Sequence, residues 1–186
     1  MGTMTSTEIQ QVTITSGLAM VILLSCSPKT ATFYHAEAAR LDSLKQCAKA
    51  IKYYDKAISL DSSVADWYYR RGVMNQRLEE TAPGYREAAL KDYSKAISIN
   101  PKHAPSYCMR GYMRCMNSSA KDPSPEGLED LSRSIESDSA YFLAYLYRGM
   151  FYFNAGRLQE SCADYRKAAE LDSASDAARL VRQQCQ

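Results

Sequence analysis

Residues 89–101 read ALKDYSKAISINP, and this motif recurs three more times with small changes. The other copies are AIKYYDKAISLD at 50–61, GLEDLSRSI at 127–135 and SCADYRKAAELD at 161–172. A second motif precedes three of the four copies, as YYRRG at 68–72, YCMRG at 107–111 and YLYRG at 145–149. Similarity at a nearly fixed period is the pattern of a repeat protein, in which each unit packs against its neighbours.

The spacing within the motif indicates pairs of closely packed helices. Ala89 and Ala96 are seven residues apart, so they share one face of a helix, and the aromatic Tyr93 lies between them on that face. Small residues let two helices approach, while large residues fill the space beside the contact. One such pair cannot bury its apolar face alone, and at least three stacked pairs are needed for stability. Four copies satisfy this requirement.

These motifs resemble the tetratricopeptide repeat, a helix–turn–helix unit of 34 residues. The resemblance covers about residues 31–173 and implies an all-α fold, namely a right-handed α-solenoid of four hairpins. The implied segments are a leader at 1–30, repeats at 31–64, 65–103, 104–141 and 142–174, and a capping helix at 175–186. Repeats two and three exceed 34 residues, and proline and glycine indicate longer loops inside them, at 80–84 and 120–127.

Arginine and aspartate occur together in a regular way along the repeats. Repeats two to four carry arginine in the first helix and aspartate in the second, whereas repeat one has Glu37 and Tyr53 at those places. We therefore expect an ion pair that bridges each hairpin, formed by Arg71 with Asp92, Arg110 with Asp130 and Arg148 with Asp164. The alternatives are a pair with the aspartate of the preceding repeat, Asp92 with Arg110 and Asp130 with Arg148, or three independent surface charges.

The resemblance also implies a binding surface. In this family the first helices line a concave groove that holds a segment of another protein. The places that face the groove give an apolar stretch in repeats three and four and a positive spot in repeat two, formed by Arg70 and Arg77. The predicted groove residues are Tyr69, Arg70, Met109, Tyr112, Met116, Leu146, Tyr147, Met150 and Phe153. Methionine adapts its shape and aromatic residues anchor interfaces, so an apolar or amphipathic segment is the expected ligand. The alternative is that these side chains belong to the core between repeats.

The amino-terminal segment has the features of a lipoprotein leader. An apolar run, GLAMVILL at 17–24, precedes Ser25 and Cys26, and eight residues are too few to cross a bilayer, which needs roughly 20. The sequence around Cys26 resembles the lipidation site of Bacteroidota lipoproteins, although no Lys or Arg precedes Lys29 and Leu24 is bulky for its place. We expect an acylated Cys26, a lipid bilayer as a partner and a location in the bacterial cell envelope. The alternative is a soluble cytoplasmic adaptor or co-chaperone-like protein whose leader is only a tail.

The other cysteines are expected to be small buried hydrophobic residues. No C-x-x-C pair occurs among them, so the usual zinc and redox spacings are missing. Cys108 and Cys115 are too far apart along one helix to form a disulfide, whereas Cys162 and Cys185 lie on adjacent predicted helices, which leaves a bridge between them as an alternative.

Composition argues against catalysis and against nucleic acid binding. The chain of 186 residues has a formal net charge of +2 and only two histidines, which lie in separate repeats. A charge this small gives no strong field toward nucleic acid. We find no phosphate-binding loop and no cysteine with a positioned base. The sequence thus predicts a protein–protein interaction scaffold that is not an enzyme, uses no cofactor or metal, and binds a protein or peptide.

Overall fold

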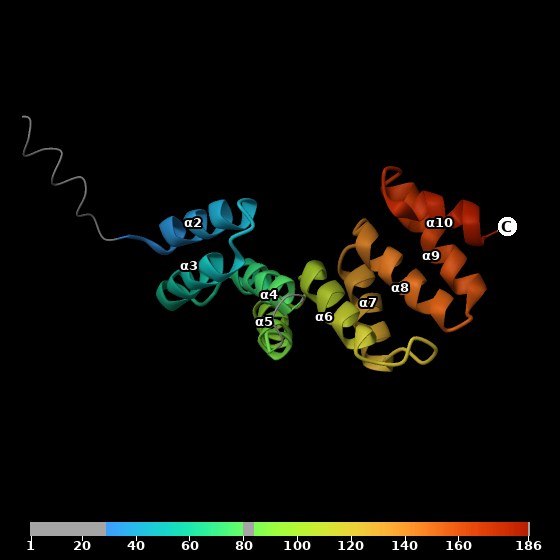
Figure 1. Cartoon of the computed structure of the whole chain (residues 1–186), viewed down its shortest axis with the longest axis horizontal. Coiled ribbons are helices and arrows are strands. Elements are labelled where there is room, and N and C mark those ends of the chain that lie inside the picture. The colour runs from blue at the N-terminus through green and yellow to red at the C-terminus, as the bar shows by residue number, and fades with distance from the viewer. Residues whose placement is uncertain (1–28, 80–83, 186) are drawn as a thin grey trace, which may run out of the picture. The chain divides into compact units, whose positions relative to one another are not determined.

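The computed structural model describes residues 29–79 and 84–185, and in these ranges it is all-α. The helices pack pairwise: α2 (Ala31–Ser43) with α3 (Cys47–Leu60), α4 (Ala65–Glu79) with α5 (Arg86–Ile99), α6 (Ala104–Met116) with α7 (Pro125–Ser137), and α8 (Phe142–Asn154) with α9 (Leu158–Leu171) (Figure 1). A shorter helix, α10 (Asp176–Gln184), packs on α9. The first helices begin at the first residues of the four predicted repeats.

Small residues lie wherever the two helices of a hairpin meet, and every one of them is buried. They are Ala38, Gly72, Gly111 and Gly149 in the first helices, and Ala50, Ala57, Ala89, Ala96, Gly127, Ser134, Ser161 and Ala168 in the second helices. A Cβ atom added to Gly111 would lie 2.6 Å from the backbone oxygen of Gly127, which is closer than real atoms approach. The backbones of α6 and α7 therefore touch directly, and glycine is required on steric grounds.

Large residues fill the space beside these contacts. Tyr54, Tyr93, Leu131 and Tyr165 occupy the same place in the four second helices, and each is at most 1% exposed. A Cβ atom on Gly72 would meet the ring of Tyr93, and one on Gly149 would meet the ring of Tyr165. The aromatic ring thus packs on the glycine of the opposite helix, which explains why glycine and tyrosine recur together in the sequence.

One turn geometry joins each hairpin to the next helix. The side chains of Asp61, Asn100, Asp138 and Asp172 each accept a hydrogen bond from the backbone N–H two residues later, at 2.9–3.0 Å. The following helix starts four residues after the aspartate or asparagine in all cases. Such a turn is a common use of these short polar side chains. It fixes the direction in which each new first helix starts.

The two longer loops are closed by side chains. In repeat two, a Glu79 carboxylate oxygen accepts hydrogen bonds from the backbone N–H groups of Gly84, Tyr85 and Arg86, and so caps α5 from the end of α4. In repeat three, the Ser124 hydroxyl accepts from the Gly127 N–H. The loop predicted at 120–127 is misplaced, because Pro125 to Gly127 already form the first turn of α7 and the connection runs from 117 to 124.

We predict that Gly111→Ala destabilises the protein although alanine favours helix formation. The added methyl group would press on the Gly127 carbonyl, which belongs to a helix backbone and cannot turn aside. The expected loss is about 1–3 kcal/mol, the usual effect of overpacking a core. Urea unfolding gives the measurement, with Ser98→Ala on the exposed face of α5 as a control expected to change stability by less than about 0.5 kcal/mol. A Gly111→Ala protein as stable as the control would contradict the close approach.

Candidate protein-binding surface and the arginine ladder

Arginine and aspartate form a bidentate ion pair inside each of three hairpins. Nε and Nη2 of Arg110 donate to the two carboxylate oxygens of Asp130 at 2.9 and 2.8 Å, and the corresponding distances are 2.8 Å each for Arg148 with Asp164. Arg71 binds Asp92 at 3.0 and 2.6 Å. The three aspartates are buried. Paired with both oxygens of a buried carboxylate, each guanidinium links the two helices of its hairpin in one fixed register.

The same arginines also reach the preceding hairpin. The remaining nitrogen, Nη1, donates to a residue sixteen positions earlier in the chain, namely Asp55 for Arg71 at 2.6 Å, Ser94 for Arg110 at 3.1 Å and Ser132 for Arg148 at 3.0 Å. We call these three arginines, with their aspartates and the residues at 55, 94 and 132, the arginine ladder. Each arginine thereby joins three helices, two in its own repeat and one in the repeat before.

The contact between neighbouring repeats is made by a different residue from the one that the alternative prediction named. The aspartate of the preceding repeat is not the partner across repeats, since Asp92 binds Arg71 and Asn75, and Asp130 binds Arg110 and Arg114. A neighbouring position, directly after the buried aromatic or leucine residue of the second helix, makes that contact instead. The sequence is consistent with this role, because the position holds a hydrogen-bond acceptor in repeats one to three, namely Asp, Ser and Ser.

A tyrosine supports each arginine of the ladder. Tyr68, Tyr107 and Tyr145 precede the arginines by three residues, and their ring centroids lie 5.5, 5.7 and 6.0 Å from the guanidinium carbon. A cation over an aromatic face is attracted to it, and this attraction offsets part of the cost of removing water from a half-buried guanidinium. Burial opposes the charge of Arg71, but hydrogen bonds to Asp92 and Asp55 hold its pKa above the usual value, so it stays charged.

The predicted groove residues of α6 and α8 are apolar or aromatic, and we call this set the apolar wall. The two helices contact each other, and the rings of Tyr112 and Tyr147 meet across them with centroids 4.6 Å apart. Spacings of three, four and seven residues place the side chains of each helix on one face. The wall consists of Met109, Tyr112 and Met116 from α6 and Leu146, Tyr147, Met150 and Phe153 from α8.

The base of the apolar wall belongs to the core, as the alternative interpretation held. Tyr112, Tyr147 and Met150 pack against the cluster that contains the buried Cys108 and Phe151. Burial raises the pKa of Tyr147 to about 12, so its hydroxyl stays protonated. The rim differs, because Met116 is 52% exposed and Leu146 and Phe153 are half-buried. Beside Met116 lies a cavity of about 270 Å³, lined by Gln76, Glu79, Arg86, Tyr112, Met113 and Met116.

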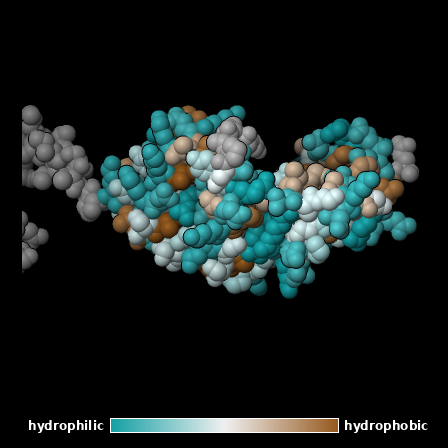
Figure 2. Space-filling model, turned by 60° about the horizontal axis from the view of Figure 1, so that its bottom comes forward, coloured by the Kyte–Doolittle hydropathy of each residue, from teal (hydrophilic) through white to brown (hydrophobic). Residues whose placement is uncertain are grey.

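The predicted groove residues of repeat two, Tyr69 and Arg70, and the neighbouring Arg77 all have partners within the described residues. Arg70 binds Asp66 at 2.6 Å, and Arg77 binds Asp42 of repeat one. The positive spot expected from Arg70 and Arg77 is therefore neutralised. Tyr69 is half-buried against His103, with ring centroids 5.4 Å apart, and its hydroxyl is hydrogen-bonded to Tyr141. On the face seen in Figure 2, hydrophilic side chains dominate and hydrophobic ones form separate small patches.

The cysteines follow the sequence expectation in part. Cys108 and Cys115 are buried as small hydrophobic residues, and burial raises the pKa of the Cys115 thiol to about 12. Cys47 is half-buried and free. Cys162 and Cys185, however, form a disulfide with their Cα atoms 5.5 Å apart, so the favoured interpretation of these two as buried thiols is wrong. Their helices are adjacent because α10 folds back on α9, and the spacing alone did not decide between a bond and two thiols.

Two features predicted for the amino-terminal segment cannot be compared with the structure. Cys26 and the apolar run at 17–24 lie outside the described residues. Within residues 29–79 and 84–185, no helix is long and apolar enough to span a membrane, and no three His, Cys, Asp or Glu side chains gather in a way that would hold a metal ion.

Comparison with protein families agrees with the hairpin geometry. The tetratricopeptide repeat model matches residues 32–64 and 137–175. The chain contains tetratricopeptide repeats. Residues 65–136, which hold most of repeats two and three, lie between the matched segments and form the same hairpins, with the longer loops described above. No curated protein matches the sequence significantly.

Solved structures of other proteins share the fold. The tetratricopeptide repeat protein TTC0263 of Thermus thermophilus superposes with a TM-score of 0.71 at 18% identity, covering 90% of this chain and 88% of the other. MamA gives 0.66 at 22% identity, with 84% and 86% covered. A chain from the APC/C hetero-tetramer Cut9–Hcn1 gives 0.68 at 16% identity, covering 89% of this chain and 30% of the other. At these identities the likeness concerns the fold alone.

We predict that Asp164→Asn lowers the free energy of unfolding by about 3 kcal/mol, because it leaves the half-buried charge of Arg148 without its partner. The matched control is Glu170→Gln in the same helix, which removes the partner of Lys167 from an exposed pair and is expected to cost less than about 0.5 kcal/mol. Chemical denaturation of the two variants gives the comparison. Equal losses in both would show that the ladder does not join the helices energetically.

Proposed function

We propose that this protein is a membrane-tethered scaffold that holds an apolar or amphipathic segment of a partner protein against the apolar wall. Tetratricopeptide repeat proteins are in general scaffolds for protein–protein interaction. The observation that carries the finer proposal is the exposed rim of the wall. Met116, Leu146 and Phe153 keep apolar surface in contact with solvent while the side chains beneath them are packed into the core.

An exposed apolar rim on an ordered base is suited to be the centre of a protein–protein interface. Its base is already ordered by the Tyr112–Tyr147 contact and by the core behind it, so binding costs little conformational entropy on this side. The thioether of Met116 can adapt to the shape of a ligand, and Phe153 offers aromatic area. The neutralised charges of repeats one and two give no strong selection for an acidic or basic ligand.

A catalytic role finds no support in the described residues. His35 and His103 lie in separate repeats, and burial lowers the pKa of both, which keeps them neutral inside the structure. The two most buried free thiols, Cys108 and Cys115, have raised pKa values and are poor nucleophiles. Binding is therefore the function that the side chains favour.

The tether and the location rest on the sequence around Cys26 and on the disulfide. Disulfides persist in oxidising compartments such as the bacterial periplasm and are rare in the cytosol. The Cys162–Cys185 bond supports a location beyond the inner membrane, in the cell envelope, and a diacylated or triacylated Cys26 would anchor the chain there. The alternative is a soluble cytoplasmic adaptor, in which Cys26 is unmodified.

We predict that Met116→Glu weakens partner binding by at least tenfold, which corresponds to about 1.4 kcal/mol, because it places a charge in an apolar contact. Leu60→Glu is the matched control: Leu60 is 57% exposed and lies at the end of α3, outside the wall. A photo-cross-linking residue is placed at position 116 or at position 60 in living cells, and we expect it to capture the partner at 116 only. Titration of the purified partner with each glutamate variant then gives the affinities. Cross-linking and affinity loss that are equal at both positions would refute the wall as the binding site.

We predict that the mature protein begins at Cys26 and carries a lipid. Mass measurement of the protein from its own membranes should show loss of residues 1–25 and the added acyl chains, and Cys26→Ser should move the protein to the soluble fraction. An unacylated chain with its first residues intact would favour the cytoplasmic alternative. This outcome would leave the wall proposal standing.

A further inference from the structure

The last helix enters the array in the same register as a first helix. Asp172 forms the turn that Asp61, Asn100 and Asp138 form before α4, α6 and α8, and α10 begins four residues after it. Ten residues after the turn residue, where the ladder arginines stand, α10 carries Arg182. Relative to the turn residue, α10 therefore begins at the same position as the first helix of a repeat.

Cys185 occupies a core position of that register. It lies thirteen residues after Asp172, and the same place after the other three turns holds Met74, Met113 and Phe151, each at most 4% exposed. Its partner Cys162 follows the small residue Ser161, as Ile51, Leu90 and Leu128 follow the small residues of the other second helices.

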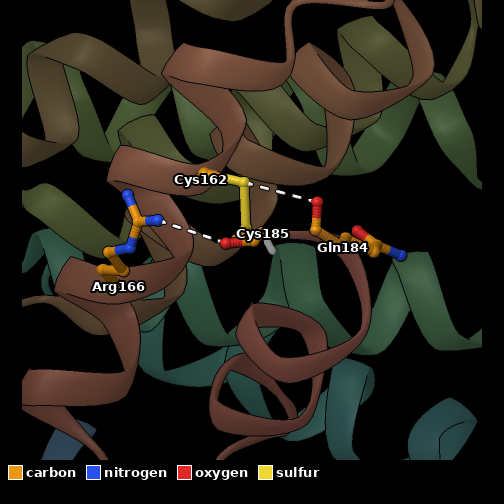
Figure 3. The surroundings of a disulfide bond; sticks show 4 residues. All are labelled: Cys162, Arg166, Gln184 and Cys185. Atoms are coloured by element: carbon orange, nitrogen blue, oxygen red, sulfur yellow. Dashed lines mark hydrogen bonds between the residues drawn. A yellow bond between two sulfur atoms is a disulfide. The ribbon is translucent and has the colours of Figure 1, made fainter.

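The residues at these two positions pack together at the three earlier repeat boundaries. Met74 and Ile51 lie in one hydrophobic cluster, Met113 and Leu90 in another, and Phe151 and Leu128 in a third. At the boundary between α9 and α10, the disulfide of Cys162 with Cys185 stands in place of this apolar pair (Figure 3). At this boundary a covalent bond thus stands where an apolar contact lies at the other boundaries.

Apart from the disulfide, α10 buries little of its own surface. It has nine residues, of which Ala177 alone is buried, while Leu180 and Val181 are half-buried. The helices α4, α6 and α8 each pack between two second helices, whereas in the described part of the chain α10 packs on α9. An isolated helix of this length is not stable in water, so α10 depends on its attachment to α9. The disulfide adds a covalent link to the packing of α10 on α9.

The disulfide is also open to reagents. A surface pocket of about 310 Å³ reaches it, lined by Leu158, Gln159, Cys162, Arg166, Gln184 and Cys185. Arg166 donates from Nη2 to the backbone oxygen of Cys185 at 3.4 Å, as Figure 3 shows. A positive charge in the neighbourhood of a cysteine favours its thiolate, which is the group that leaves when the bond is broken.

We propose that the Cys162–Cys185 bond is a redox latch, which a dithiol reductant opens and which thereby releases α10 from the end of the array. A thiolate of the dithiol attacks one sulfur, the S–S bond breaks and a mixed disulfide forms. The other cysteine leaves as a thiolate, and the second thiol of the reagent then displaces the attacked cysteine from the mixed disulfide. The products are two cysteine thiols in the protein and an oxidised, cyclic disulfide of the reagent. Release uncovers the face of α9 that α10 covers.

Hydrogen exchange of the full chain, with and without dithiothreitol, tests the latch. We expect amides of residues 176–184 to exchange at least tenfold faster after reduction, with amides of α6 unchanged, and Cys185→Ser to behave like the reduced protein. Cys47→Ser is the control, since it removes a free thiol and leaves the bond in place. Equal protection of α10 in both states, or alkylation showing free thiols at 162 and 185 in the native protein, would overturn the proposal.

A second variant separates the latch from ordinary packing. Cys162→Leu with Cys185→Met installs the pair that Leu90 and Met113 supply at an earlier boundary. We expect α10 of this double variant to stay protected and to be insensitive to dithiothreitol. Reductant-dependent exchange in the double variant would mean that reduction acts elsewhere in the chain, and the latch would be rejected.

Discussion

The distance between paired helices is the constraint on which the rest of this structure depends. Where Gly111 faces Gly127, no side-chain atom separates the two helix backbones, and glycine, alanine or serine occupies the corresponding places of the other hairpins. Glycine inside a helix costs roughly 1 kcal/mol relative to alanine, so its recurrence requires a compensating gain. The gain is the burial of a whole aromatic ring against the glycine in two hairpins, and direct backbone contact in a third.

Close packing alone does not fix how one hairpin is stacked on the next, and the arginine ladder supplies that information. Each guanidinium uses two nitrogens inside its hairpin and a third nitrogen toward the hairpin before it. Since the geometry of a guanidinium is rigid and planar, the three contacts set an orientation as well as a distance. The same stacking brings α6 beside α8 and so creates the apolar wall, whose base is core and whose rim faces solvent. The proposed binding surface is thus a consequence of the inter-repeat geometry.

Much of this could be read from the sequence because it depends on periodicity. The helix starts at Ala31, Ala65, Ala104 and Phe142 follow from the motif spacing, and the joint appearance of arginine and aspartate indicated which side chains meet. Contacts that depend on rotation between repeats were not accessible in this way. The roles of Asp55, Ser94 and Ser132, the neutralisation of Arg77 by Asp42, and the choice between buried thiols and a disulfide at Cys162 all require the relative placement of helices that the period does not give. Serine at two of the three contact positions is also too common a surface residue to attract notice.

The most direct test of the account is the proximity of the two helix backbones in repeat three. In the folded chain with its glycines labelled, nuclear Overhauser contacts between the α-protons or amide protons of Gly111 and Gly127 report distances below about 5 Å. The account predicts such contacts, together with contacts from Gly149 to the ring of Tyr165, because both pairs touch in the structure. If these glycines showed contacts only within their own helices, the hairpins would not be packed as described, and the ladder, the wall and the latch would lose their common basis.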